Sequence, residues 1–316
     1  MAAPHASIVT ITPNPALDVS TSVDEVVAEH KLRCGPTRLD PGGGGVNVSR
    51  VIRNLGGRSL AVYAVGGPTG QAYREILERE GVVGRVVRIG GSTRESFTVD
   101  ETSTGQQYRF VLQGPTMHEP EWRALLAAVA DDFPVSGYVV PSGSLPPGAP
   151  TDLYARIARL AREHDARCVV DTSGDALHAA LTEGVFLIKP SRRELAELVG
   201  SDLTDEESLV EASRELVGRR ACEVVALTLG GAGAIVVTAH EVLRLPTPHV
   251  DVRSTVGAGD SFLGAFVLRL AQGRSVRDAF RAGVAAGSAS AALEATELCS
   301  AEDVARLEEA LEPTAG

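Results

Sequence analysis

Short apolar runs rich in β-branched residues recur along the chain and alternate with longer segments of helical periodicity. The apolar runs occupy residues 7–12, 60–66, 137–143, 167–173, 185–190 and 223–230. The helical segments include residues 71–80, 121–130, 152–163 and 206–217. Strands that are apolar throughout, rather than at alternate positions, are typical of a parallel sheet that helices cover on both faces. The pattern therefore predicts an α/β protein, a three-layer α/β/α sandwich with a mostly parallel central sheet.

Two stretches, residues 17–40 and 93–112, interrupt this succession and alternate polar with apolar positions. The second stretch carries Ser-Thr-Gly at 103–105 between its two halves, which favours a β-hairpin exposed on one side. We interpret the two stretches as insertions that build a small β-sheet lid. Since no internal repeat or low-complexity linker divides the chain, residues 1–316 are expected to form a single domain.

Four loops follow directly on predicted strands and are rich in glycine, serine and threonine. They are SGSLPPG (142–148), VVDTSG (169–174), LIKPS (187–191) and TLGGAG (228–233). In open α/β sheets, ligands bind where the strands end at their carboxyl edge. The four loops therefore predict a ligand-binding cleft at that edge.

Composition and charge narrow the choice of partners. The chain has 316 residues, of which 44% are hydrophobic, and a formal net charge of -11. Since no basic run stands out, this charge disfavours a nucleic-acid partner. No window approaches the roughly 18 apolar residues of a membrane span, so we expect no membrane partner and a cytoplasmic protein. The cysteines are far apart and form no Cys-x-x-Cys, which disfavours a disulfide framework and a zinc site; they are Cys34, Cys168, Cys222 and Cys299.

The segment STVGAGDSF (254–262) places small residues before an aspartate and a helix-like apolar run. The backbone amides of Gly257, Ala258 and Gly259 would form an anion hole at the positive end of that helix. Asp260 would repel an anion there unless it accepts a proton from an attacking hydroxyl, so it is our candidate general base. The alternative is a glycine-rich helix start that needs no ligand.

A second glycine run, LDPGGGGVNVSRVIRNLGG (39–57), superficially resembles a dinucleotide fingerprint. It follows no strong strand, lacks the Gly-x-Gly-x-x-Gly spacing and has no acid at a strand end about twenty residues later. These departures disfavour a nicotinamide oxidoreductase. We expect instead that backbone amides of the run and the Asn47 side chain contact sugar hydroxyls.

Five motifs carry a resemblance to a known family. PGGGGVN, SGSLPPG, the Lys-Pro of LIKPSRREL, TLGGAGA and STVGAGDSF resemble, in order and spacing, the PfkB/ribokinase family of sugar kinases over nearly the whole chain. KLRC, STR, GQQYRFVLQG and GVAAGSAS look most like its PfkB-type, or minor, 6-phosphofructokinases. Relatives that act on fructose 1-phosphate or tagatose 6-phosphate usually have a lysine in the glycine run, where this chain has PGGGG.

The resemblance implies a ribokinase-like fold and ATP-dependent phosphorylation of fructose 6-phosphate to fructose 1,6-bisphosphate. The neighbouring alternatives are 1-phosphofructokinase and tagatose-6-phosphate kinase. It assigns Asp260 as the base and the amides of Gly257, Ala258 and Gly259 as the anion hole. The implied sugar contacts are Asp18, Gly43, Gly44, Asn47 and Ser144. The cations implied for the substrate phosphate are Lys31, Arg33 and Arg94, of which Arg94 can bind a phosphate bidentately.

The resemblance also implies a nucleotide side and a metal. ATP would contact Lys189, Ser191, Thr228, Gly230 and Gly233, and Glu194 would hold Mg²⁺ through water. Two departures weaken the match: Ser191 stands where the family has asparagine, and residues 293–295 are Leu-Glu-Ala where close relatives tend to have Asn and Gly before a threonine. Ser191 could simply cap the next helix, and Glu194 could simply complement its dipole. These departures also raise the alternative of a catalytically weak sugar-phosphate sensor.

The oligomeric state follows from the predicted lid. Its strands leave exposed edges, which proteins commonly cover. This argument and the resemblance both predict a homodimer that pairs the two lids.

Overall fold

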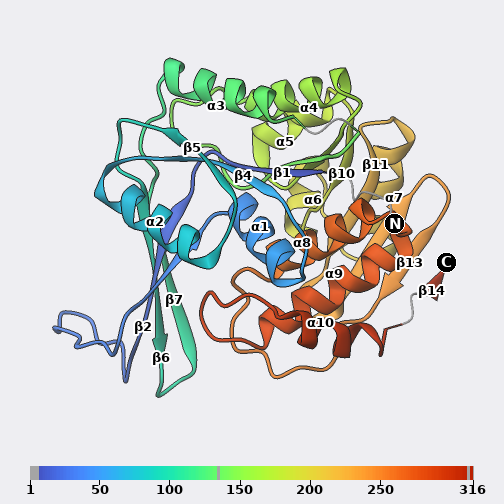
Figure 1. The fold of residues 1–316 in the computed structure, drawn as a ribbon. Helices are drawn as coiled ribbons and strands as arrows, with labels where there is room; N and C mark the ends of the chain where they lie inside the picture. The colour runs from blue at the N-terminus through green and yellow to red at the C-terminus, as the bar shows by residue number, and fades with distance from the viewer. Residues whose placement is uncertain (1–6, 134–135, 312–313, 316) are drawn as a thin grey trace.

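The computed structural model describes residues 7–133, 136–311 and 314–315 (Figure 1). Over these residues, the central sheet has ten strands in the order β14-β13-β12-β11-β10-β9-β8-β1-β4-β5. Seven of them run parallel: β1 (Ile8–Thr12), β4 (Leu60–Val65), β5 (Gly84–Arg88), β8 (Tyr138–Pro141), β9 (Arg167–Val170), β10 (Val185–Ile188) and β11 (Cys222–Thr228). The three antiparallel strands at one edge are β12 (Ala234–Thr238), β13 (Val242–Leu245) and β14 (Thr314–Ala315).

Each apolar run of the sequence forms a strand of this sheet, so the prediction of a mostly parallel sheet is confirmed. The pattern missed β5, which lies at the sheet edge and is buried only in part, and the short antiparallel hairpin β12–β13. Neither has the signature of a parallel strand that is buried on both faces.

Helices cover both faces of the sheet and complete the predicted three layers. One face packs against α3 (Glu119–Asp131), α4 (Leu153–Glu163), α5 (Gly174–Leu181), α6 (Arg192–Val199) and α7 (Glu206–Gly218). The other packs against α1 (Gly44–Asn54), α8 (Ala258–Ala271), α9 (Val276–Ala291) and α10 (Ala301–Glu308). Helix α2 (Gly67–Glu80) covers β4 through the buried side chains of Tyr73 and Leu77. In Figure 1, α3 and α4 of the first layer lie at the top, and α9 and α10 of the second lie below.

A separate small sheet is formed by four strands in the order β3-β2-β6-β7. They are β3 (Arg38–Gly42), β2 (Ala16–Val23), β6 (Arg94–Glu101) and β7 (Gln106–Val111). The predicted hairpin of the second stretch is β6–β7, which pairs antiparallel from Ser96 opposite Val111 to Glu101 opposite Gln106. The small sheet extends away from the central sheet at the lower left of Figure 1.

The first alternating stretch contains strand only near its ends. Residues 24–37, between β2 and β3, are irregular and mostly exposed, and they form the segment that projects furthest at the lower left in Figure 1. Charged residues and the Gly35-Pro36 pair interrupt strand formation there, because proline cannot donate to a β-ladder.

Two further observations concern the cysteines and the helices. The four cysteines are free thiols; Cys168, Cys222 and Cys299 are buried, and Cys34 is exposed. Among the described residues, no helix combines the length and apolar character needed to cross a bilayer.

Candidate active site

A polar cavity of about 390 Å³ lies between the small sheet and the carboxyl edge of the central sheet. Of the four loops predicted to form a cleft, those that follow β8, β9 and β10 line this cavity, whereas residues 228–233 after β11 do not. The small sheet and the starts of α1 and α8 supply the remaining walls. The predicted site residues among the lining residues are Asp18, Gly43, Gly44, Asn47, Arg94, Ser144, Lys189, Glu194, Gly257 and Asp260.

The start of α8 forms one wall of the cavity. Gly257 caps this helix with a φ of 75°, a left-handed conformation that favours glycine. Asp260 lies in the first turn, and its Oδ2 accepts a 2.8 Å hydrogen bond from Nδ2 of Asn47. Burial, together with the nearby charge of Asp171, raises the pKa of Asp260 to about 6. The carboxyl group therefore loses its proton within the physiological range, as a general base requires.

A lysine–aspartate pair lies beside this helix start. Nζ of Lys189, which follows β10, is 3.2 Å from Oδ1 of Asp171, which follows β9. Burial opposes the charge of Lys189, but the charges of Asp171 and Asp260 outweigh it and raise the pKa of the lysine. A Cβ at Gly259 would lie 3.2 Å from Nζ, so glycine lets the ammonium approach the helix closely. A buried cation thus adjoins the amides proposed as an anion hole.

The glycine run brings α1 against the ends of β1 and β8. Gly43 caps α1 with a φ of 115°, and a Cβ there would press on Thr12. A Cβ at Gly44 would overlap Oγ of Ser142 in the loop after β8. The close packing of the backbone, independent of any ligand, therefore requires glycine at both positions.

Asp18 and Arg94 lie on the paired strands β2 and β6, where Arg94 is opposite Ala16 and Asp18 is opposite Ser96. Burial raises the pKa of Asp18 to about 7, and the charge of Arg94 limits the rise. A side chain at Gly42, on the neighbouring strand, would overlap the Asp18 carboxylate. Nη1 of Arg94 donates to the Leu112 carbonyl at 3.1 Å, and Nη2 donates to the Asn14 carbonyl at 3.0 Å. Arg94 is therefore held in position by backbone acceptors.

The structure reveals cavity residues that the sequence analysis did not single out. Arg109 on β7 lines the cavity, and among the described residues its guanidinium has no hydrogen-bond or ion-pair partner. Asp171 and Thr296 also line the cavity. The signals were present, because Arg109 lies in the alternating GQQYRFVL segment and Asp171 lies in a predicted loop. Neither could be placed without the register of β7 on β6 and the adjacency of β9 and β10.

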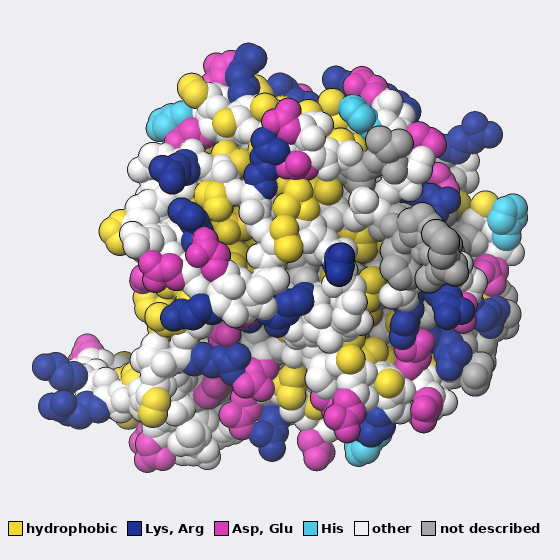
Figure 2. Space-filling model, viewed as in Figure 1, with side chains coloured by type: hydrophobic (Ala, Val, Ile, Leu, Met, Phe, Trp, Pro, Cys, Tyr) yellow, Lys and Arg dark blue, Asp and Glu magenta, His cyan; other side chains and the backbone are white. Residues whose placement is uncertain are grey.

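Lys31 and Arg33, both predicted to meet the substrate phosphate, lie outside the cavity of their own chain. They belong to the exposed segment 24–37. In Figure 2, cationic side chains gather at the tip that projects at the lower left. In the described structure, neither residue lines the cavity that contains Asp260.

The residues predicted for the nucleotide lie around the start of α6 and the end of β11. Oγ of Ser191 accepts a 3.3 Å hydrogen bond from the Glu194 amide, and Oε2 of Glu194 accepts from the amide and hydroxyl of Ser191 at 2.7 and 2.8 Å. This is a reciprocal capping box. Ser191 also bridges to Thr228.

The two glycines of the nucleotide side differ. Gly230 has a φ of 59° and open space around it, whereas a Cβ at Gly233 would overlap the Leu245 carbonyl. Gly233 is therefore required by the approach of β13, and Gly230 is required by its backbone conformation. Neither lines the cavity.

The metal predicted at Glu194 has few protein ligands available. Within the described ranges, no three His, Cys, Asp or Glu side chains are grouped so that they could hold a metal ion. Mg²⁺ usually keeps several waters and binds one or two carboxylates together with substrate phosphates. Glu194 lines the cavity and can serve as such a carboxylate, so the donor set fits a nucleotide-bound Mg²⁺ better than a resident ion.

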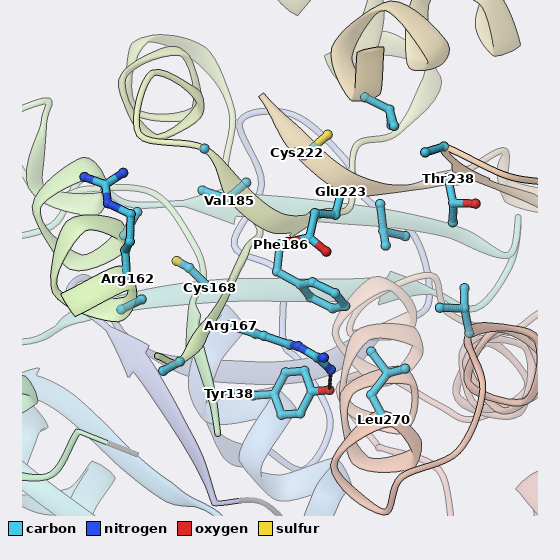
Figure 3. Close-up of a pocket in the computed structure, with 18 of the residues that line it drawn as sticks. Tyr138, Arg162, Arg167, Cys168, Val185, Phe186, Cys222, Glu223, Thr238 and Leu270 are labelled. Carbon is cyan, nitrogen blue, oxygen red and sulfur yellow. Dashed lines mark hydrogen bonds between the residues drawn. The ribbon is translucent and has the colours of Figure 1, made fainter. Parts of the chain in front are cut away.

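A larger hollow, of about 1670 Å³, lies at the opposite edge of the sheet (Figure 3). Tyr138, Arg167 and Val185, the first residues of β8, β9 and β10, line it. Nη1 of Arg167 donates to the Tyr138 hydroxyl at 2.7 Å, and its guanidinium carbon lies 5.0 Å from the centre of the Phe186 ring. Because ligands of open α/β sheets bind at the carboxyl edge, we place the active site in the smaller cavity.

The fold of this chain is ribokinase-like. The structure of Arabidopsis thaliana ribokinase complexed with ribose and ATP shares this fold, with a TM-score of 0.75 at 18% identity over 97% of this chain and 99% of that one. The chain belongs to the pfkB family of carbohydrate kinases, which it matches over residues 15–303.

Three members of the family show which proteins this chain is similar to. An ATP-dependent 6-phosphofructokinase isozyme 2 from Mycobacterium tuberculosis is 44% identical over 97% of this chain and 91% of its own length. The structure of phosphofructokinase-2 from Escherichia coli in complex with fructose-6-phosphate is 37% identical, with a TM-score of 0.91, over 96% of this chain and 99% of that one. A 1-phosphofructokinase from Bacillus subtilis is 33% identical over 90% of this chain and 92% of its own length.

Proposed function

We propose that this chain transfers the γ-phosphoryl group of ATP to the 1-hydroxyl of fructose 6-phosphate. The observation that carries the proposal is the arrangement of Asp260 at the start of a buried helix, in one cavity with the acid Asp18 and the cations Arg94 and Arg109. The relatives named 6-phosphofructokinase, at up to 44% identity, support this substrate over fructose 1-phosphate.

In the proposed reaction, Asp260 accepts the proton of the attacking hydroxyl while the oxygen bonds to the γ-phosphorus. The bond between the γ-phosphorus and the bridging oxygen breaks at the same time, and ADP leaves. The amides of Gly257, Ala258 and Gly259, with the dipole of α8, stabilise the charge on the transferring group. The Asp18 carboxylate accepts hydrogen bonds from neighbouring sugar hydroxyls, and Asn47, Ser144 and the amides of Gly43 and Gly44 complete the sugar contacts.

The nucleotide is proposed to lie against the start of α6 and the end of β11. Lys189 would neutralise phosphate charge, while Ser191, Thr228, Gly230 and Gly233 would contact the nucleotide along the backbone. Mg²⁺ bound to ATP would offset the charge of the phosphates, and Glu194 would orient its waters. This assignment rests on the resemblance, on Lys189 and Glu194 in the cavity lining, and on the bridge between Ser191 and Thr228.

The substrate phosphate is proposed to bind at the small sheet, which acts as a lid. Arg94 and Arg109 are the cavity cations of β6 and β7. Lys31 and Arg33 are exposed outside the cavity of their own chain. We infer that the protein is a homodimer in which the small sheets pair and each projecting segment reaches the cavity of the partner subunit. We also propose a cytoplasmic location, since the cysteines are free thiols.

A panel of hexose phosphates tests the proposed substrate. ADP release is measured with Mg-ATP and fructose 6-phosphate, fructose 1-phosphate or tagatose 6-phosphate. We expect the highest kcat/KM with fructose 6-phosphate and a bisphosphate product. A higher kcat/KM with either of the other sugars would contradict the substrate assignment. Binding of a sugar phosphate without any turnover would identify a sensor.

A further inference from the structure

Arg50 is a buried cation on α1 to which the mechanism so far gives no role. It is 5% exposed and lies one helical turn after Asn47. A guanidinium has five N–H donors in a fixed fork. In this structure each donor has an acceptor, and the acceptors come from three different elements.

The acceptors of Arg50 fix its position firmly. Nε and Nη2 donate to the two carboxylate oxygens of Glu80 at 2.8 and 2.7 Å, at the end of α2. Nη2 also reaches Asp40 at 3.5 Å, and Nη1 donates to the Pro41 carbonyl at 3.2 Å, both on β3. The remaining donor of Nη1 reaches Oδ1 of Asn47 at 3.3 Å.

This last contact determines which way the Asn47 amide faces. A side-chain amide has an acceptor at one end and a donor at the other, and rotation by half a turn exchanges them. Arg50 occupies the oxygen end, so the nitrogen end faces the active site. There Nδ2 donates to Oδ2 of Asp260 at 2.8 Å. With the amide reversed, Oδ1 of Asn47 would face the Asp260 carboxylate and repel it.

We propose that Arg50 is a positioning residue for phosphoryl transfer: it holds the Asn47 amide in the orientation that donates to Asp260. The proposal rests on the role of Asp260 as the base. It also explains why an arginine with five donors, and not a lysine with three, occupies this site between α1, α2 and β3.

The same contacts join the small sheet to the catalytic aspartate. Asp40 and Pro41 belong to β3 of the small sheet, and Asn47 belongs to the helix that packs against α8. Oδ2 of Asp40 also accepts a 2.6 Å hydrogen bond from Thr296, another cavity residue. Arg50 therefore fixes the position of the Asn47 amide relative to the small sheet, which also carries Asp18.

The test is a double-mutant cycle on kcat, with Arg50→Lys, Asn47→Ala and the double variant. We expect Arg50→Lys to lower kcat about tenfold, the effect of one misdirected hydrogen bond to a charged group, with KM for ATP changed less than about twofold. In the Asn47→Ala background, Arg50→Lys should have little further effect, because no amide remains to be oriented.

Arg53→Lys is the matched control. Arg53 lies on the same helix, contacts Glu80 as well and is 35% exposed at its side chain, but none of its contacts is with Asn47. We expect its kcat to stay within about twofold of the wild-type value. An equal fall of kcat in Arg53→Lys, or equal factors for Arg50→Lys with and without Asn47, would overturn the proposal.

Two further variants keep the test decisive. Removing one partner of a buried ion pair can prevent folding. If Arg50→Lys does not fold, Glu80→Gln weakens the same clamp, and its effect on kcat should likewise disappear in the Asn47→Ala background; equal effects in both backgrounds would refute the proposal. Asp260→Asn distinguishes failure of the base assignment from failure of the role of Arg50. If Asp260→Asn keeps its kcat, the base assignment fails. If its kcat collapses but the effects in the Arg50–Asn47 cycle are additive, only the role of Arg50 is overturned.

Discussion

Two of the acids in the cavity, Asp18 and Asp260, owe their raised pKa values to burial. Asp18 and Asp260 have pKa values raised to about 7 and about 6, in both cases chiefly because the cavity removes water from the charged form. Arg94 limits the rise at Asp18, and Asn47 and Lys189 limit it at Asp260. Because ionisation of such a buried carboxyl group is unfavourable in the free protein, hydrogen bonds donated by a ligand stabilise the carboxylate strongly. This property suits a carboxylate that binds sugar hydroxyls and one that acts as a general base.

Removal of the base should affect rate far more than binding. Asp260→Asn keeps the shape of the side chain but cannot accept the proton, so we expect kcat to fall by about 100- to 10,000-fold with little change in KM. In the wild type, kcat/KM for the sugar should fall as the pH drops from about 7 through 6, since both acids must be ionised. Steady-state kinetics check this, and a variant that keeps more than about a tenth of kcat contradicts the assignment.

Asp18 should lower the stability of the free protein at high pH. The pKa of an unperturbed aspartate is 3.8 and that of Asp18 in the folded protein is about 7, so the unfolded chain loses this proton at lower pH than the folded chain. The contribution of Asp18 to the free energy of unfolding is therefore greatest below pH 4 and decreases until about pH 7. Asp18→Asn should flatten this dependence and raise the melting temperature at pH 8, while sugar turnover is lost.

Thermal unfolding between pH 5 and 8 measures the effect of Asp18→Asn. The exposed acid Asp24, at the end of β2, supplies the control variant Asp24→Asn. An Asp18→Asn protein that is less stable than the wild type at pH 8 would show that the buried carboxylate has stabilising partners.

Ser191 and Glu194 should set the requirement for free Mg²⁺ in opposite directions. Oγ of Ser191 donates to Oε2 of Glu194 and so competes for the oxygen that would hold metal-bound water. Ser191→Asn can keep the helix cap without this hydroxyl and should lower the requirement, whereas Glu194→Gln removes the charge and should raise it. Rates are measured against free Mg²⁺ at fixed Mg-ATP. An unchanged requirement in Ser191→Asn would limit Ser191 to the cap.

At the residue scale, sequence reasoning found the parts of the site that short motifs specify. Asp18, Asn47 and Asp260 lie far apart in the chain, and the structure brings them into one cavity. Arg50 could not be identified in this way, because a helix arginine in an arginine-rich chain is usually exposed. Its role depends on three elements that meet only in the folded protein.

At the scale of elements, α8 and the small sheet differ in how they hold the site. Helix α8 is buried along most of its length and packs against α1 and α9, so the position of Asp260 in its first turn is fixed by packing. Strands β6 and β7 are only partly buried. Elements with few buried contacts open more readily, so the small sheet is the part that a ligand can order.

We expect fructose 6-phosphate to slow amide hydrogen exchange in the β6–β7 hairpin and in residues 24–37. The proposed lid closes over the sugar and excludes water, which protects its backbone hydrogen bonds. Mass spectrometry with and without saturating sugar measures this effect, and α4, which lies away from the cavity, serves as the internal control. Exchange that is unchanged in both segments would remove the lid assignment.

Element prediction succeeded where the burial pattern was simple. The strands buried on both faces were evident from apolar runs, and β6–β7 was evident from alternation around a Ser-Thr-Gly turn. Residues 24–37 could not be judged in the same way, since charged side chains and the Gly35-Pro36 pair interrupt the alternation, and the structure assigns no strand to these residues. Their conformation depends on contacts that local sequence does not encode.

At the scale of the whole molecule, the small sheet exposes apolar side chains at its edges and carries cations that do not reach the cavity of their own chain. Its edge strands expose Leu39, Phe110 and Val111, with exposed fractions of 45%, 55% and 64%. Lys31 and Arg33 project beyond it, away from the cavity of their own chain. Apolar side chains at open sheet edges favour a partner, and a second copy would bring cations to each cavity.

Complementation between two defective chains tests this shared site. One chain carries Asp260→Asn, and the other carries Lys31→Ala with Arg33→Ala. In a hybrid dimer, one cavity combines an intact Asp260 with intact cations from the partner subunit. If subunits mix at random, half of the dimers are hybrids with one good site in two, so activity at low sugar concentration should recover to about a quarter of the wild-type value. Activity no higher than the sum of the separate variants, or a monomer by sedimentation, would place Lys31 and Arg33 outside the catalytic site.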